Sequence, residues 1–358
     1  MNKRIVLTGG GTAGHVTPNI ALLPSLRAEG FEPYYIGSYE GIEKGLIEAE
    51  GVPYRGIATG KFRRYMSLKN ITDPFRVIRG VEEARKILRE WQPDVVFSKG
   101  GFVAVPVVTA AHSLKIPVIA HESDLTPGLA NRLSFPYVQK ICCNFPETLE
   151  HLPAGKAVLT GSPIRRELLE GSREAGLAFA GFTGEKPVLM MMGGSSGSVI
   201  VNDALRHILP ELTHDFDVIH LCGKGRLETS IKISGYVQFE YISKELKDLF
   251  AAADIVLSRA GANAICELLA LKKPNILVPL SKAASRGDQI LNARSFEKQG
   301  FSYVLEEEEM DNDSLLAGIR HVYEHRDEYI RAMNESTQSD GISAVMALIR
   351  EAAGVAQN

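Results

Sequence analysis

The stretch "LTGGGTAGHVTP" occupies residues 7–18 and continues the β-branched run that starts with Ile5 and Val6. An apolar run that ends in glycines and leads into helix-compatible residues predicts a strand, a tight turn and a helix. The glycines at 9, 11 and 14 satisfy G-x-G-x-x-G, the pattern of dinucleotide-binding folds. The same turn carries His15 where the helix should begin. The stretch therefore predicts an α/β fold with a ligand at this turn.

The rest of the chain repeats this alternation of short strands and helical patterns, which is typical of parallel α/β architecture. Expected strands of the first half are residues 4–8, 33–36, 94–97, 118–121, 140–143 and 158–160. Expected helices there are residues 81–91, 103–114 and the segment after Pro127. A second strand series follows: "PVLMMMGGSSG", "DVIHLCG", "VQFEYI", "DIVLSRAG", "PNILVPL" and "FSYVLE". Its expected helices are residues 199–213, 246–253, 262–271, 288–299 and 314–323.

Length and composition limit the classes of protein that fit. A chain of 358 residues predicts two domains, and the junction is expected within "TGSPIRRELL", residues 160–169. The net charge of −3 gives no basic field for nucleic acid. The apolar runs are too short to span a membrane, and the N-terminus enters a strand directly, so we expect a cytoplasmic protein. The four cysteines form no C-x-x-C pair, which favours buried free thiols.

A dinucleotide site needs an acidic residue at the end of the second strand, where it binds ribose hydroxyls. That strand reads "PYYIGS", and Gly37 and Ser38 stand where the acid belongs. Glu40 and Glu43 come later, in the helix that follows. The absence of this acid argues against a nicotinamide-dependent oxidoreductase.

Four other segments resemble the first turn: "SKGGFVAVP" (residues 98–106), "HESDLTPG" (121–128), "MGGSSGS" (192–198) and "SRAGANAICE" (258–267). Each follows a strand and opens a helix, so backbone N–H groups and a helix N-terminus converge on the carboxyl edge of the sheet in each half of the chain. Such an edge holds a phosphate or a developing oxyanion. In the second half, helix starts near Ser195 and Ala262 suit a diphosphate, and Glu267 suits the two hydroxyls of a ribose. Arg165 and Gln289 are candidate polar contacts.

Two D-x-D pairs, Asp215–Asp217 and Asp311–Asp313, do not follow strand ends, so neither predicts a metal site. The acidic run "LEEEEMDND", residues 305–313, is interpreted as a solvated loop in which Asp311 or Asp313 caps the next helix.

In collinear order, "GGGTAGHVTP", "KGGFVAVP", "HESDLTPG", "TGSPIR", "GGSSGS" and "SRAGANAICELLALKKPNILVP" resemble the MurG glycosyltransferases over nearly the whole chain. The resemblance implies the GT-B fold, two Rossmann-like domains that face a central cleft. The expected domains are residues 1–162 for the acceptor and the membrane and 163–339 for the UDP-sugar, with a last helix within 340–358 that returns to the first domain. The implied reaction moves N-acetylglucosamine from UDP-N-acetylglucosamine to the 4-hydroxyl of an undecaprenyl-linked muramyl-peptide, lipid I, and makes lipid II for peptidoglycan. No cofactor and no protein metal site are implied, and assistance by a divalent ion stays open.

The resemblance also implies site residues. Donor contacts are implied for Thr12, Ala13, Gly14, Asp124, Arg165, Ser195, Ile242, Ala262, Asn263, Ala264, Ile265, Cys266, Glu267 and Gln289. Glu267 would hold the ribose, and the backbone around Ile242 the uracil. Acceptor-side residues are His15, Gly100, Gly101, His121 and Glu122. The chain departs from the family pattern at Ala13 (usually glycine), Asp124 (asparagine), Ser198 (alanine) and Asp288 (glutamine).

An inverting displacement needs a base for the acceptor hydroxyl. His15 and Glu122 are the two candidates, and His15 could instead bind the acceptor diphosphate or cap its helix. The segment "GKFRRYMSLKN", residues 60–70, mixes basic and apolar side chains and suits an anionic membrane surface, although a basic loop without that role fits as well. We therefore expect a peripheral enzyme on the inner face of the bacterial membrane. Other functions that fit are a GT-B transferase with another acceptor, a UDP-N-acetylglucosamine 2-epimerase and an inactive sugar-nucleotide binder.

Overall fold

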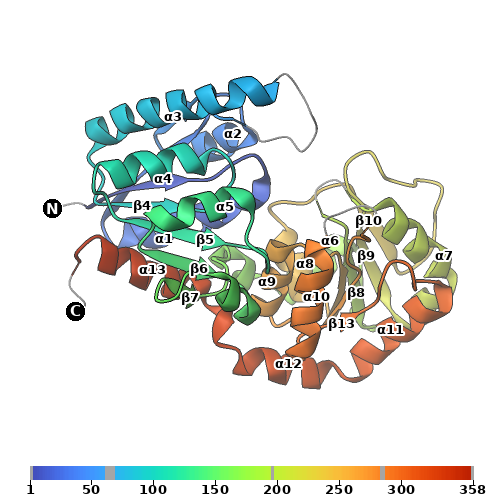
Figure 1. The fold of residues 1–358 in the computed structure, drawn as a ribbon. Helices are drawn as coiled ribbons and strands as arrows, with labels where there is room; N and C mark the ends of the chain where they lie inside the picture. The colour runs from blue at the N-terminus through green and yellow to red at the C-terminus, as the bar shows by residue number, and fades with distance from the viewer. Residues whose placement is uncertain (1–2, 61–68, 195–196, 283–286, 356–358) are drawn as a thin grey trace. The chain divides into compact units, whose positions relative to one another are not determined.

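The computed structural model describes residues 3–60, 69–194, 197–282 and 287–355. The chain divides into two compact units, one formed by Met1–Arg165 with Asp340–Asn358 and the other by Arg166–Ser339. Each unit has its own parallel sheet (Figure 1).

The first unit contains a seven-stranded sheet with the order β3-β2-β1-β4-β5-β6-β7. Its strands are β1 (Lys3–Thr8), β2 (Phe31–Ser38), β3 (Tyr54–Ile57), β4 (Val95–Ser98), β5 (Val118–Glu122), β6 (Lys140–Cys143) and β7 (Ala157–Leu159). Its helices are η1 (Ala13–His15), α1 (Thr17–Ala28), α2 (Ile42–Ala49), α3 (Lys69–Trp91), α4 (Ala104–Ser113), α5 (Leu129–Ser134), η2 (Phe135–Tyr137), η3 (Pro146–His151) and α13 (Gly341–Ala352).

Alternate residues of these strands pack on opposite faces of the sheet, as the period of two requires. Ile5 and Leu7 lie in one core with α1 and α13. Val6, between them, lies in the other core with α3 and α4. Figure 1 shows α3, α4 and α5 on one side of this sheet and α1 with α13 on the other.

Helix α13 belongs to the first unit although it is the last helix of the chain. Its buried residues Ile342, Val345, Met346 and Ile349 recur at the spacing of a helix with one apolar face. Burial of each such side chain contributes roughly 1.5–3 kcal/mol. The Asp340 carboxylate accepts a hydrogen bond from the Ser343 N–H at 3.1 Å and so caps the helix start.

The second unit contains a six-stranded parallel sheet with the order β10-β9-β8-β11-β12-β13. Its strands are β8 (Val188–Met192), β9 (Asp217–Leu221), β10 (Tyr236–Phe239), β11 (Ile255–Ser258), β12 (Asn275–Leu277) and β13 (Tyr303–Val304). Its helices are η4 (Arg166–Glu170), α6 (Arg173–Ala180), α7 (Val199–Asp215), α8 (Leu246–Ala252), α9 (Ala262–Ala270), α10 (Asp288–Lys298), α11 (Asn312–Glu324), α12 (Arg326–Glu335) and η5 (Thr337–Ser339).

Both sheets confirm the predicted class, two Rossmann-like α/β domains. The strand and helix patterns listed from the sequence are all present, with end points that differ by a few residues; α3 is the exception and starts twelve residues earlier than predicted, at Lys69 rather than 81. The short edge strand β3, the eight-residue helix α6 and the polar helix α12 carry weak patterns and were not predicted. Asp311 caps α11 as expected, since its carboxylate accepts a hydrogen bond from the Ser314 N–H at 2.8 Å.

The two sheets share one topology. In each, the first strand of the series lies between the second and the fourth, so the strand order reverses between β1 and β4 and between β8 and β11. Ligands of doubly wound sheets bind at the carboxyl edge beside this reversal. The topology therefore points to the loops after β1, β4, β8 and β11, which include four of the five segments singled out from the sequence.

Candidate active site

The loops after β1 and β4 approach each other more closely than side chains allow. A Cβ atom at Gly101 would lie 2.4 Å from the carbonyl oxygen of Gly10, and one at Gly100 would lie 2.7 Å from Oδ1 of Asn131. Both glycines also have left-handed backbones, with φ of 92° for Gly100 and 82° for Gly101. Only glycine fits these positions, so the loop after β4 is built to lie against the first glycine loop.

Buried polar side chains hold the first glycine loop from below. The Tyr35 hydroxyl donates to the Gly9 carbonyl at 2.7 Å, and Asn19 Nδ2 donates to the Thr8 carbonyl at 3.3 Å. Asn19 Nδ2 also lies 3.2 Å from the Tyr35 hydroxyl. The end of β1 is thus fixed before the chain reaches the exposed residues Thr12 and Ala13.

The carboxylate of Glu43 supports the same loop from the side of α2. It accepts hydrogen bonds from the N–H groups of Gly11 at 3.2 Å and Ser38 at 3.0 Å, and from the Ser38 hydroxyl at 2.5 Å. Glu43 is fully buried, yet these hydrogen bonds outweigh its burial and lower its pKa. A buried carboxylate therefore occupies an N–H group that a dinucleotide phosphate would use.

His15 ends the short helix η1, which also contains Ala13 and Gly14. Its ring atom Nδ1 lies 3.1 Å from the Thr12 hydroxyl, and its backbone N–H donates to the Thr12 carbonyl at 3.1 Å. Burial and the nearby Lys99 ammonium lower the pKa of His15 to about 4, although the Gly10 carbonyl and Glu43 act in the opposite direction. The half-buried imidazole is therefore neutral near pH 7 and able to accept a proton.

His121, at the end of β5, is fully buried and has defined partners on both ring nitrogens. Nδ1 lies 2.9 Å from the Lys99 ammonium, and Nε2 lies 3.0 Å from the Gly161 carbonyl. Because an ammonium only donates and a carbonyl only accepts, Nδ1 is the acceptor and Nε2 carries the proton. Burial and Lys99 hold the pKa of His121 well below its usual value, in keeping with this neutral tautomer.

Glu122 follows on the same strand, and its carboxylate accepts three hydrogen bonds. The donors are the N–H groups of Asp124 at 3.0 Å and Gly128 at 3.1 Å, and Asn131 Nδ2 at 2.8 Å. Burial raises the pKa of Glu122, while Asn131 opposes that shift. Both oxygens are engaged in closing the loop of residues 122–128, so this arrangement favours a supporting part for Glu122.

In the second unit, the loop after β8 leads into α7, and Ser195 lies outside the described residues. Ser198 caps α7 with its hydroxyl, which accepts from the Val201 N–H at 3.5 Å and from Arg259 Nε at 3.0 Å. Arg259 follows β11, is buried, and pairs with Glu307 at 2.5 Å between Nη1 and Oε2. Arg259 thereby connects the start of α7 to the segment after β13 at the sheet's carboxyl edge.

Helix α9 starts at that edge and carries the largest group of predicted donor residues. Ala262, Ile265 and Cys266 are buried, whereas Asn263, Ala264 and Glu267 are half-buried. The aligned peptide dipoles of α9 give this edge a partial positive charge at the helix N-terminus. Because β8 and β11 are neighbours in the parallel sheet, α9 and the loop after β8 begin at the same carboxyl edge.

The other predicted donor residues come from separate elements. Ile242 is half-buried beyond β10, Asp124 is half-buried in the loop of residues 122–128, and Arg165 is half-buried at the end of the first unit. Gln289 lies on α10, where its Oε1 accepts from the Leu280 N–H at 3.1 Å. Nothing in the described residues gathers three His, Cys, Asp or Glu side chains in a metal-binding arrangement.

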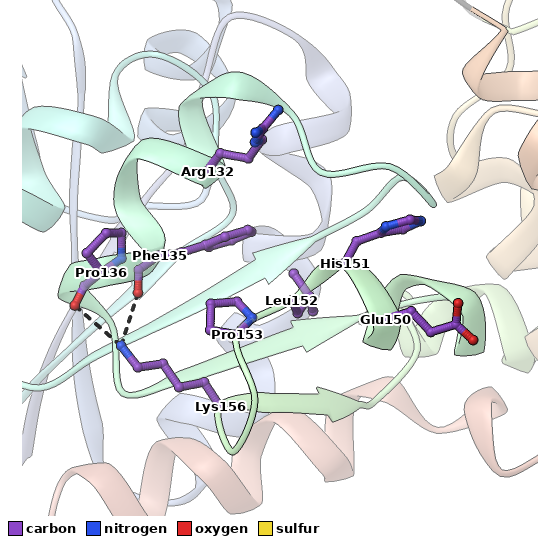
Figure 2. Close-up of a pocket in the computed structure, with 8 residues that line it drawn as sticks. All are labelled: Arg132, Phe135, Pro136, Glu150, His151, Leu152, Pro153 and Lys156. Atoms are coloured by element: carbon purple, nitrogen blue, oxygen red, sulfur yellow. Dashed lines mark hydrogen bonds between the residues drawn. The ribbon is translucent and has the colours of Figure 1, made fainter.

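A hollow of about 460 Å³ lies elsewhere on the first unit, along α5, η3 and the turn before β7 (Figure 2). Its walls are Arg132, Phe135, Pro136, Glu150, His151, Leu152, Pro153 and Lys156. Figure 2 shows the Lys156 ammonium bonded to the carbonyls of Phe135 and Pro136, at 3.1 and 3.3 Å. None of the predicted site residues lines this hollow.

Sequence reasoning missed three charged residues that shape these loops: Lys99, Glu43 as a loop support, and Arg259. Lys99 and Arg259 had a visible signal, because each is a basic residue directly after a buried strand. Glu43 had none, since its partner Gly11 is 32 positions away.

Two Rossmann-like units, each with glycine-rich loops at the carboxyl edge of a parallel sheet, are the architecture of the GT-B class. Residues 5–143 match the glycosyltransferase family 28 N-terminal domain, and residues 188–346 match the glycosyltransferase family 28 C-terminal domain. The chain belongs to glycosyltransferase family 28.

Curated relatives are similar over nearly their full length. The UDP-N-acetylglucosamine–N-acetylmuramyl-(pentapeptide) pyrophosphoryl-undecaprenol N-acetylglucosamine transferase of Lachnospira eligens is 63% identical over 98% of this chain and 99% of its own. The enzyme of that name from Clostridium botulinum strain 657 is 56% identical over the same shares.

Solved structures show the same fold. Acinetobacter baumannii MurG has a TM-score of 0.78 at 22% identity, over 98% of this chain and 99% of that one. The UDP-GlcNAc 2-epimerase of Neisseria meningitidis has a TM-score of 0.65 at 14% identity, over 97% and 100% of the two chains.

None of the described helices is both long enough and apolar enough to cross a bilayer.

Proposed function

We propose that this enzyme transfers N-acetylglucosamine from UDP-N-acetylglucosamine to the 4-hydroxyl of the muramyl residue of lipid I and so makes lipid II. The observation that carries the proposal is the 63% identity, over 98% of the chain, to a relative named for this transfer. The full-length match includes every loop of the candidate site.

The reaction is an inverting displacement at the anomeric carbon of the donor sugar. The acceptor oxygen forms a bond to that carbon while the bond to the UDP oxygen breaks, and the proton of the hydroxyl passes to a base. His15 is the proposed base, because its imidazole is neutral and half-buried beside the acceptor-side loops. The departing diphosphate gains negative charge, which the N-terminus of α9 stabilises.

The donor residues act mainly by orientation. The Glu267 carboxylate accepts hydrogen bonds from the ribose hydroxyls, and the backbone near Ile242 binds the uracil. Arg165, Ser195 and Gln289 contact the diphosphate and sugar, with Thr12, Ala13, Gly14 and Asp124 from the first unit. The acceptor lies along the loop of Gly100 and Gly101, and the buried His121 supports the acceptor side through its hydrogen bonds.

We also propose that the enzyme binds the inner face of the cytoplasmic membrane, where its lipid acceptor resides. The predicted membrane segment of residues 60–70 lies mostly outside the described residues. The neighbouring part of α3 supports the proposal, since Phe75 is 73% exposed and Ile78 58% exposed. Arg79 lies on the same helical stripe, so apolar and cationic groups face solvent together.

One experiment tests the transfer. Purified enzyme is incubated with UDP-N-acetylglucosamine and lipid I, and the lipid product is analysed by mass spectrometry. We expect the lipid to gain one N-acetylhexosamine, with one UDP released per transfer. A lipid-linked diphosphate without the muramyl sugar serves as the negative acceptor. Conversion of UDP-N-acetylglucosamine to its 2-epimer without acceptor, or UDP binding without turnover, would overturn the proposal.

A further inference from the structure

Lys99 is a fully buried lysine that directly follows β4, between the two glycine loops of the first unit. Its backbone N–H donates to the Thr8 carbonyl at 2.8 Å, and its Cβ lies 3.2 Å from the position of a Cβ built on Gly9. Lys99 is thus packed directly beneath the loop that carries His15. Burial of an ammonium is costly unless hydrogen bonds compensate it, so its position calls for an explanation.

The Lys99 ammonium is bound to the segment that opens the loop of residues 122–128. It donates to His121 Nδ1 at 2.9 Å and to the Ser123 hydroxyl. On the opposite side, the Ser123 carbonyl accepts from Asn144 Nδ2 at 2.9 Å. The start of this loop is therefore held between a buried cation and a buried amide.

Through His121, the Lys99 ammonium is also linked to Gly161, which lies just after β7, the last strand of the first sheet. Because Lys99 donates to Nδ1, His121 is locked in the tautomer that donates from Nε2 to the Gly161 carbonyl at 3.0 Å. Gly161 has a left-handed backbone with φ of 71° and stands four residues before the first unit ends at Arg165. One side chain thereby sets the positions of the β4, β5 and β7 ends.

A cation at this position also has an electrostatic effect that a neutral side chain of equal size would lack. Lys99 and Glu43 are the charged groups that act on His15, with opposite signs, and the Gly10 carbonyl adds to the effect of Glu43. Donation by the ammonium into the Ser123 oxygen polarises that hydroxyl, which makes its proton a better donor to a substrate oxygen.

We propose that Lys99 is a positioning residue of the transfer reaction: its buried ammonium fixes the acceptor loop, residues 122–128, to the glycine loop of His15 through Ser123 and His121. This inference rests on the proposed function insofar as it assigns residues 122–128 to the acceptor substrate. The part that concerns how Lys99 holds this loop does not depend on that function. Lys99 contacts neither substrate and acts through the residues it holds.

The first test needs no substrate. Histidine labelled with ¹³C and ¹⁵N is incorporated, and the His15 resonance is assigned by its loss in His15→Gln. In Lys99→Met we expect the pKa of His15 to rise by about 1 pH unit, since a like charge is removed. Lys99→Arg should leave it near the wild-type value, and so should Lys86→Met, which removes an exposed charge from α3. An unchanged pKa in Lys99→Met would overturn the electrostatic part.

The second test is kinetic and uses the full chain with both substrates. Lys99→Met should raise the KM for the lipid acceptor about 10-fold or more, with the Kd for UDP unchanged, whereas Lys86→Met should change neither. Ser123→Ala removes one acceptor of the ammonium but keeps the lysine and its hydrogen bond to His121, so it should raise the acceptor KM even if Lys99→Met fails to fold. Wild-type acceptor KM values in both Lys99→Met and Ser123→Ala, or equal losses for donor and acceptor, would overturn the proposal. Failure of wild-type enzyme to form product would instead count against the proposed function.

Discussion

The carboxylate of Glu43 accepts a hydrogen bond at 3.2 Å from the backbone N–H of Gly11, in the middle of the first glycine loop. The loop that matches a dinucleotide pattern in sequence is therefore stabilised by an anion of the protein itself. This pair links α2 to the loop of His15, and its contribution can be measured.

Glu43→Gln should destabilise the first unit by about 1–3 kcal/mol. The amide has one oxygen, so one of the N–H donors at Gly11 and Ser38 loses its acceptor in a buried place. Urea denaturation monitored by Trp91 fluorescence measures this, because the chain's single tryptophan lies in the first unit. Glu40→Gln, at an exposed position three residues earlier, is the matched control. Equal midpoints for the two variants would show that the Glu43 hydrogen bonds add nothing to stability.

The acid limb of the pH–rate profile should report His15. Since its pKa is about 4 in the free enzyme, kcat/KM should fall only as the pH approaches 4 and not near 6.5. Bound diphosphates bring negative charge, which favours the imidazolium, so the acid limb of kcat should lie at higher pH than that of kcat/KM.

His15→Ala supplies the decisive variant for the base. Loss of a general base lowers kcat by about 10²–10⁴-fold, while the Kd for UDP should stay within about twofold. His151→Ala, at an exposed histidine of the same unit, should keep wild-type turnover. Near wild-type kcat in His15→Ala would exclude His15 as the base.

These residues illustrate what sequence patterns predict and what they miss. Strand patterns and glycine-rich turns are local, so the two sheets and the loops after β1, β4, β8 and β11 could be predicted. From the sequence, Glu43 was interpreted only as an acid that comes too far along the chain to bind the ribose of a dinucleotide. Its contact with Gly11 leaves no local pattern that could have been recognised. Arg259 differs in part: its place after a buried strand was a visible signal, but its partners Ser198 and Glu307 come from other elements and could not be predicted.

Glu267→Gln should weaken UDP binding by roughly 10- to 100-fold, the worth of a hydrogen bond to a charged group. Isothermal titration calorimetry with UDP measures the Kd without the lipid acceptor. The matched control is Glu324→Gln, at an exposed position on α11 of the same unit. An unchanged Kd would place the ribose contact on another residue.

Membrane binding should depend on the exposed stripe of α3. The double variant Phe75→Ser, Ile78→Ser removes two large apolar side chains from solvent-facing positions. We expect about 10-fold weaker sedimentation with vesicles of phosphatidylglycerol and phosphatidylcholine, and lower activity on lipid I in vesicles. Leu227→Ser, Leu291→Ser removes two partly exposed apolar side chains, 44% and 42% exposed, from the second unit and should have no effect. Equal binding of both double variants would remove α3 from the membrane contact.

Stability of the first unit should fall as the pH drops below 6.5, because His15 and His121 are held neutral in the folded state. Both pKa values are lowered on folding, so the unfolded chain binds protons that the native chain does not, and stability rises with pH in this range. Each histidine adds about 1.4 kcal/mol per pH unit between its unfolded and folded pKa. Urea midpoints from Trp91 fluorescence at pH 7 and pH 5 measure how steeply the free energy of unfolding changes with pH. His15→Gln removes one titrating group and should make this dependence less steep. The exposed His151→Gln should leave the slope as in the wild type, and a wild-type slope in His15→Gln would show that His15 already titrates normally in the folded enzyme.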